Sequence, residues 1–212
     1  MKYIKLFENF DSYDPYELMI LPPNKKGEMF WYEIKKRDDA NFDLLRDLIT
    51  LGANLDWQSV SGFTALHWCA YNNNSDIAKM LIGAGVDVNI QEENGKTALH
   101  WCASENHPKI AKMLIDAGAD LNIRQKNGET ALIICAYRNY LQLAKMLIDA
   151  GADMNVQDNV GWTALRYCAN WKNQKMVQMM LDAGADKTIS NDMGESPYNV
   201  ARTQEIKDLL KP

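Results

Sequence analysis

The segment GFTALHWCA occupies residues 62–70, and close copies follow at intervals of 33 residues: GKTALHWCA at 95–103, GETALIICA at 128–136 and GWTALRYCA at 161–169. A second word recurs with the same period, as GVDVN at 85–89, GADLN at 118–122 and GADMN at 151–155. Repetition at one fixed period indicates an array of similar structural units. We therefore predict a repeat protein in which each unit buries its apolar face against its neighbours.

Each copy carries signals for a pair of helices. Thr64 is suited to cap the first helix, and Asn73 to end it, because Asn tolerates the left-handed conformation. In the second helix, Ile77 and Leu81 belong to an apolar stripe that needs a neighbouring helix. Gly85 then permits the turn that ends the second helix. The unit is predicted to be a helix–turn–helix.

These words and their period resemble those of the ankyrin repeat family. The resemblance covers residues 29–212 and implies an all-α solenoid of stacked helix–turn–helix units joined by β-turn or hairpin-like loops. The expected units are 29–61 (degenerate), 62–94, 95–127, 128–160, 161–193 and a C-terminal cap, 194–212. Residues 1–28 then form an N-terminal extension.

The composition excludes several classes of protein. The 212 residues include 23 Lys and Arg against 28 Asp and Glu, a net charge of −5. A mildly acidic chain lacks the electrostatic footprint of a general binder of nucleic acid or anionic membranes. The sequence also has no apolar run of bilayer length and no secretory signal. We expect a soluble, cytoplasmic protein with neither nucleic acid nor membrane as a partner.

The four cysteines imitate a disulfide or zinc framework, but they all occupy one repeat position. Equivalent helices in a stack lie ~8–10 Å apart, beyond the ~7 Å limit between the Cα atoms of a disulfide. We expect small buried thiols in a reducing compartment. The residues are Cys69, Cys102, Cys135 and Cys168.

Two histidines precede cysteines by two residues, as in His67 with Cys69. On a helix this spacing turns the side chains about 200° apart, so the pair cannot share a metal ion. The family resemblance instead implies bonds from His67 to Thr64 and from His100 to Thr97. Those bonds should be missing in the next two units, which have Ile133 and Arg166 at this position. No metal is expected.

The repeated turn words contain aspartates, and Asx side chains commonly bond to neighbouring backbone groups in turns. We expect a structural role for Asp87, Asp120, Asp153 and Asp186. Some animal members of the family are hydroxylated at a turn asparagine, which leaves a minor alternative as a modification substrate. The matching positions are Asn89, Asn122 and Asn155.

Enzyme signatures are absent from the sequence. It contains no phosphate-binding glycine loop, no H-E-x-x-H and no G-x-S-x-G. We therefore predict no catalytic residues, no cofactor and no small-molecule substrate, and interpret the chain as a module that binds a protein.

Ankyrin repeats typically bind partners through turn tips and the exposed face of their first helices, which line a concave surface. Aromatic and Arg side chains, which are enriched at interface hot spots, are unusually frequent at the matching positions of this chain. The aromatic residues gather toward the two ends, with charges between them. The candidate partner-binding residues are Phe63, Tyr71, Asn72, Lys96, Glu105, Glu129, Tyr137, Arg138, Trp162, Asn170 and Trp171.

Two other rows of residues repeat at one position each and are expected to pack inside the array. The first row faces the helix stack beside the cysteines and comprises Trp68, Trp101, Ile134 and Tyr167. The second forms a packed seam of the second helices, because Met fills irregular gaps in cores. It comprises Met80, Met113, Met146 and Met179.

The first 28 residues lie outside the repeat. Residues 1–10 place Tyr3, Leu6, Phe7 and Phe10 on one helical face, and prolines from Pro15 onward interrupt any continuation. Residues 24–27 are predicted to form a surface turn. The extension is expected to cap the array. Alternatively, its first ten residues, which resemble leaders of some phage and marine microbial proteins, direct assembly or packaging, and the chain is then a structural, phage-associated protein.

Overall fold

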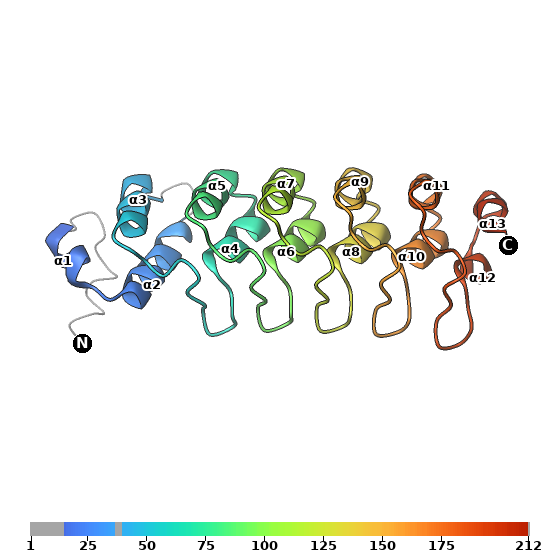
Figure 1. Cartoon of the computed structure of the whole chain (residues 1–212), viewed down its shortest axis with the longest axis horizontal. Helices are drawn as coiled ribbons and strands as arrows, with labels where there is room; N and C mark the ends of the chain where they lie inside the picture. The colour runs from blue at the N-terminus through green and yellow to red at the C-terminus, as the bar shows by residue number, and fades with distance from the viewer. Residues whose placement is uncertain (1–14, 37–39, 212) are drawn as a thin grey trace.

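The computed structural model describes residues 15–36 and 40–211, and within these ranges the chain forms helices and loops without strands. Figure 1 shows two rows of helices that run along an elongated array, from α1 at one end to α13 at the other, with long loops projecting to one side. Each unit contributes one helix to each row. This arrangement confirms the predicted all-α solenoid.

The first row consists of the first helix of each unit: α2 (Pro23–Ile34), α4 (Ala65–Asn72), α6 (Ala98–Glu105), α8 (Ala131–Arg138), α10 (Ala164–Asn170) and α12 (Pro197–Val200). The second row consists of α3 (Phe42–Thr50), α5 (Ser75–Gly83), α7 (Pro108–Asp116), α9 (Leu141–Asp149), α11 (Gln174–Asp182) and α13 (Gln204–Leu210). A short helix, α1 (Pro15–Ile20), precedes both rows.

The first helices begin and end where the sequence predicts. Thr64 caps α4 by accepting a hydrogen bond from a backbone N–H in the first turn. Asn73, Asn106 and Asn139 follow α4, α6 and α8 in the left-handed conformation, with φ of 59°, 58° and 59°. Lys172 takes this place after α10 with φ of 62°. A lysine there is unusual, because the left-handed region is costly for residues other than Gly and Asn.

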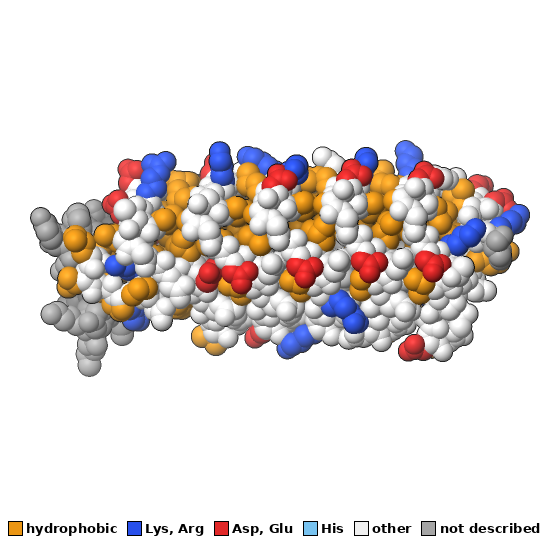
Figure 2. Space-filling model, in the orientation of Figure 1, with side chains coloured by type: hydrophobic (Ala, Val, Ile, Leu, Met, Phe, Trp, Pro, Cys, Tyr) orange, Lys and Arg blue, Asp and Glu red, His pale blue; other side chains and the backbone are white. Residues whose placement is uncertain are grey.

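The core lies between the two rows and is continuous along the array. Consecutive first helices pack against each other, as do consecutive second helices from α5 onward, and the two helices of each unit pack together. Ile77 and Leu81 of α5 are fully buried, and each such side chain stabilises the fold by about 1.5–3 kcal/mol. The methionine seam, exemplified by Met80, is half-buried against this core. Figure 2 shows apolar and acidic side chains recurring at regular intervals along the drawn face.

The turn words form a hydrogen-bonded ladder from unit to unit. The Asp87 carboxylate accepts the Asn89 N–H at 2.9 Å, and the Asn89 side chain then accepts the Asp120 N–H at 2.8 Å. The same two bonds recur in the following units as far as Asp186. These bonds confirm that the repeated aspartates and asparagines hold successive turns in register.

The long loops are hairpin-like, although no strand is formed in the described residues. The Glu92 N–H bonds to the Lys96 carbonyl within one loop at 3.0 Å, and the Lys126 N–H bonds to the Asn94 carbonyl of the preceding loop at 2.9 Å. Gly95 has φ of +78°, and a Cβ on it would lie 3.0 Å from the Lys126 nitrogen. Glycine is therefore required for this approach of the loops.

The expectation of a surface turn at residues 24–27 is wrong, because these residues lie within α2. Pro23 is compatible with the first turn of a helix, where no N–H is needed. Lys26 is buried and donates to the Leu51 carbonyl at 2.8 Å. Gly27 approaches the backbone so closely that a Cβ would lie 2.1 Å from the Asn54 carbonyl oxygen. Lysine and glycine thus serve packing here and do not form a turn.

Helix α2 continues across the predicted boundary between residues 28 and 29. Upstream of it, Leu18 of α1 is buried in the common core. The expected amphipathic face of residues 1–10, with Tyr3, Leu6, Phe7 and Phe10, lies outside the described residues. None of the helices in the described part of the chain is long and apolar enough to cross a membrane.

Candidate protein-binding surface

Five aromatic side chains from α2, α4, α6 and the loop before α4 meet at the start of the array. They form what we call the N-terminal ring cluster: Trp31, Phe63, Trp68, Tyr71 and Trp101. The ring centroids of Trp31 and Trp68 lie 5.9 Å apart, and Trp101 lies 5.3 Å from Tyr71 and 5.4 Å from Phe63. Stacking of the units therefore brings together rings that are up to 70 residues apart in the sequence.

The N-terminal ring cluster surrounds an open cavity of about 440 Å³, which Ser61 also lines. Tyr71 is 44% exposed, whereas Phe63, Trp68 and Trp101 are half-buried. This volume falls within the range of about 300–1,000 Å³ typical of ligand pockets. The cluster can accept a side chain of a binding partner.

Two lysines approach these rings. The Lys96 ammonium lies 4.2 Å from the centroid of Trp101, and the Lys35 ammonium lies 5.7 Å from Trp31 and 5.9 Å from Trp68. Such cation–π contacts contribute about 0.5–2 kcal/mol each, depending on solvation. The cavity is therefore apolar in its walls and positively charged at its edges.

Two histidines hold the loops beside this surface. The His67 Nδ1 lies 2.8 Å from the Thr64 hydroxyl, and its Nε2 lies 3.0 Å from the Lys96 carbonyl in the next loop. His100 repeats this bridge to Thr97 and Glu129. Burial lowers the pKa of both imidazoles, that of His100 to about 4. The implied Thr–His bonds are confirmed, and they also link adjacent units.

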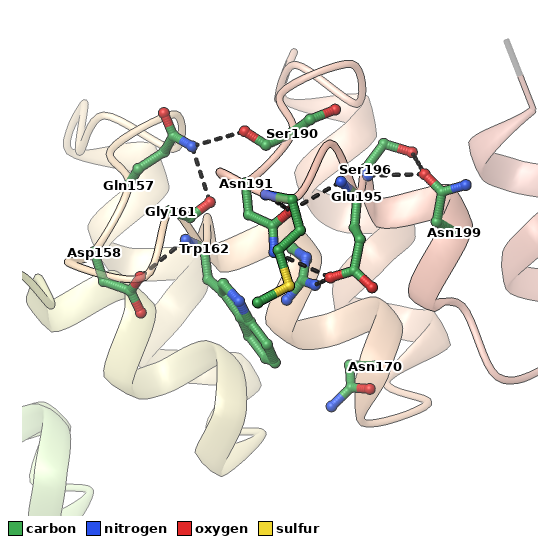
Figure 3. Close-up of polar contacts among 12 residues, drawn as sticks. Gln157, Asp158, Gly161, Trp162, Asn170, Ser190, Asn191, Glu195, Ser196 and Asn199 are labelled. Carbon is green, nitrogen blue, oxygen red and sulfur yellow. Dashed lines mark hydrogen bonds and ion pairs between the residues drawn. The ribbon is translucent and has the colours of Figure 1, made fainter.

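The unit at 128–160 replaces the histidine with buried Ile133, and the unit at 161–193 replaces it with Arg166. Arg166 is only 2% exposed, and its guanidinium carbon lies 3.7 Å from the ring centroid of Trp162. It forms an ion pair with Glu195 of the next loop at 2.6 Å. Figure 3 shows Glu195 hydrogen-bonded to Asn191. An ion pair thus takes over the inter-unit role of the histidine.

Trp162 belongs to a second group, the C-terminal ring cluster of Tyr137, Trp162 and Tyr167. The Tyr167 ring lies 4.8 Å from Trp162 and 5.5 Å from Tyr137. The Tyr167 hydroxyl donates to the buried Asp158 carboxylate at 2.7 Å, and burial together with this bond raises the Tyr167 pKa. Internal polar contacts therefore occupy much of this cluster.

Trp171 stands apart from both clusters and is 60% exposed. With Asn170, Lys172 and Arg202 it lines a cavity of about 400 Å³ at the end of α10. The Asn170 side chain accepts a bond from the Arg202 guanidinium at 3.1 Å. A strongly exposed Trp that lines a cavity together with two cationic side chains is suited to contact a partner.

The remaining predicted residues lie beside the two ring clusters or between them. Glu105 and Arg138 are exposed at the ends of α6 and α8. Glu129 accepts a bond from the Gln125 side chain at 2.6 Å, and Asn72 donates to the Trp68 carbonyl at 3.0 Å. The predicted residues therefore do not form one contiguous site, because the ring clusters are separated along the array.

The prediction that one aromatic row packs inside the stack is incomplete. Ile134 is 1% exposed, as expected, but Trp68 and Trp101 are half-buried and line the cavity. An indole is larger than the space that isoleucine fills, so part of each ring remains at the surface. Trp31 and Lys35 could not be predicted from repeat positions, because their unit is degenerate. In the sequence, their role at the site is indicated only by the short spacing between an aromatic residue, Trp31, and a lysine, Lys35.

The four cysteines are free and fully buried, and burial raises the pKa of each thiol. They are therefore kept protonated, as expected for core residues. Within residues 15–36 and 40–211, no group of three His, Cys, Asp or Glu side chains is placed to hold a metal ion.

A family model for ankyrin repeats, in three copies, matches residues 35–125 and again 119–191. These matches cover most of the chain, which belongs to the ankyrin repeat family. Members of this family are generally protein–protein interaction modules and are typically not enzymes. No curated protein matches the chain.

Proposed function

We propose that this chain is a non-enzymatic adaptor, scaffold or inhibitor that binds one protein partner through its first-helix face. We define this face as the exposed side of the first helices together with the loop tips. The observation that carries the proposal is the open N-terminal ring cluster, in which Tyr71 is 44% exposed beside an apolar cavity. An exposed apolar patch of this kind is typical of an interaction site.

Binding is favoured by the rigidity of the array. The loops are already held in register by the turn ladder and by the histidine bridges. A surface that is ordered before binding loses less conformational entropy when the partner docks. The four free cysteines support a reducing compartment, and we place the protein in the cytoplasm.

The test is affinity capture from a lysate of the source cell, with quantitative mass spectrometry. The baits are the full chain and a Tyr71→Ala/Trp171→Ala variant, which removes two exposed rings without opening the core. We expect a partner that the full chain retains and that the variant loses by about tenfold or more, equivalent to about 1.4 kcal/mol.

The matched control is Leu141→Ala, since Leu141 is 37% exposed on a second helix, away from the first-helix face. Each bait must keep the cooperative thermal unfolding of the full chain. The proposal would be contradicted if the Leu141 variant lost the partner as strongly as the Tyr71/Trp171 variant did. It would also be contradicted if the Tyr71/Trp171 variant retained the partner fully.

A further inference from the structure

The N-terminal ring cluster has an unusual combination of apolar walls and unpaired positive charge. Its cavity is lined by five aromatic rings and Ser61, with no carboxylate among the lining residues. Among the described residues, neither Lys35 nor Lys96 forms an ion pair. Both ammonium groups lie instead against the rings of the cavity wall.

Two acidic groups of the described residues that lie close to these lysines in the sequence have other partners. The Glu92 carboxylate is buried and accepts the backbone N–H of Lys96 and the side chain of Asn94. The Glu33 carboxylate is buried and pairs with Lys36. Within the described part of the chain, the positive charge at the edge of the cavity therefore has no ion-pair partner and is available to a ligand.

A cationic ligand is disfavoured at this position. Such a ligand gains its binding energy from the faces of aromatic rings. Here Trp31, Trp68 and Trp101 already interact with the chain's own ammonium groups, which would repel a second positive charge. An apolar ring can still enter the cavity, and negative charge beside that ring would be attracted by Lys35 and Lys96.

We infer that the N-terminal ring cluster binds an aromatic side chain of the partner protein that is flanked by carboxylates. This inference rests on the proposed protein-binding function and specifies the chemistry that the partner presents. The ring fills the cavity of about 440 Å³, and the flanking carboxylates pair with Lys35 and Lys96. An acidic partner segment is thus recognised by a chain that itself carries a net charge of −5.

The test is calorimetric titration of the full chain with a blocked peptide of sequence Asp-Glu-Phe-Asp-Glu. Three further peptides replace the Phe with Ala, the acidic residues with Gln and Asn, or the acidic residues with Lys. We expect the acidic Phe peptide to bind at least about tenfold more tightly than each of the other three. Added salt should weaken its binding, because surface charge pairs are screened.

A pair of charge variants isolates the contribution of the two lysines. Lys35→Gln/Lys96→Gln should weaken binding of the acidic peptide by about tenfold or more and remove most of its salt dependence. The matched control is Lys79→Gln/Lys175→Gln, which removes two exposed lysines from α5 and α11. It changes the net charge equally and should leave the affinity unchanged.

Several results would overturn the inference. They are equal binding of the neutral or Lys-flanked peptide, tighter binding of a trimethyl-lysine peptide, and no binding of the acidic peptide at ~1 mM. Sedimentation tests one further alternative. If the unmodified chain is a dimer and the Lys35/Lys96 variant is a monomer, the cavity binds a second copy of the chain instead. None of these results would conflict with capture of a partner that depends on Tyr71 and Trp171. Failure of the inference is therefore distinguishable from failure of the proposed function.

Discussion

The two ring clusters are built on equivalent positions of the repeat but are used differently. In the N-terminal ring cluster the inter-unit bond is made by His67, which lies under the surface and leaves the rings open. In the C-terminal ring cluster Arg166 occupies the corresponding position and lies against Trp162, while Tyr167 bonds to Asp158. One repeat position can thus provide either an accessible cavity or internal support. The residue at the third position of the first helix contributes to this difference.

The largest effect is expected from removing the support of the C-terminal ring cluster. Arg166→Ala leaves a cavity beside Trp162 and removes the ion pair with Glu195, so the free energy of unfolding should fall by about 3–4 kcal/mol. Arg166→Met fills the same space without a charge and should cost less than half as much. Denaturant titration measures both. A cost below about 1 kcal/mol for the Ala variant would show that Arg166 does not support the cluster.

The second largest effect on stability should appear at acidic pH and should arise only in the units bridged by His67 and His100. Burial lowers the pKa of His100 to about 4 from an ordinary value of 6.5. Between these values the unfolded chain binds a proton that the folded chain does not, so stability falls as the pH falls from 6.5 to 4. The loss for this group approaches about 3 kcal/mol.

The control for this prediction is His100→Ile, which copies Ile133, the residue at this position in the unit at 128–160. The free energy of unfolding of the variant should depend less steeply on pH between 6.5 and 4. Carboxylates contribute equally to both proteins, so their contribution cancels when the two free energies are subtracted. Identical pH dependence of the two proteins, followed by thermal unfolding, would mean that His100 is not held neutral in the fold.

The smallest effect concerns the ends of the first helices. Lys172 adopts φ of 62°, where the preceding units have asparagine. Lys172→Asn should raise the free energy of unfolding by about 0.5–1 kcal/mol, because Asn adopts this conformation at lower cost. Asn139→Lys is the reciprocal change and should lower it by a similar amount. Unchanged stability in both variants would show that the left-handed position is not strained by lysine.

Much of the fold follows from the sequence because identical words impose identical local structure. The Thr64 cap, the left-handed Asn73 and the turn ladder of Asp87 are each determined by contacts within a few residues or with the next copy. The degenerate first unit lacks those words. The sequence therefore predicts a turn at residues 24–27, whereas these residues lie in α2, where Gly27 closely approaches Asn54.

The candidate site was only partly predictable. The positions of Phe63, Tyr71 and Trp171 follow from their place in the repeat, but the exposure of Trp68 and Trp101 depends on side-chain size and on neighbouring units. The position occupied by these two tryptophans is buried where it holds Ile134. A repeat pattern thus specifies where the backbone runs, whereas the open or closed state of a cluster depends on contacts between different copies.

The most direct test of the contrast between the two clusters is an NMR titration of the six tryptophan indole N–H signals in the full, ¹⁵N-labelled chain. The titrant is the acidic Phe peptide, and single Trp→Phe variants assign the signals. We predict that Trp31, Trp68 and Trp101 shift on binding while Trp162 stays unchanged. A shift of Trp162 as large as that of Trp101, or no shift at all, would contradict an N-terminal ring cluster that binds the peptide and a C-terminal ring cluster in which Arg166 covers Trp162.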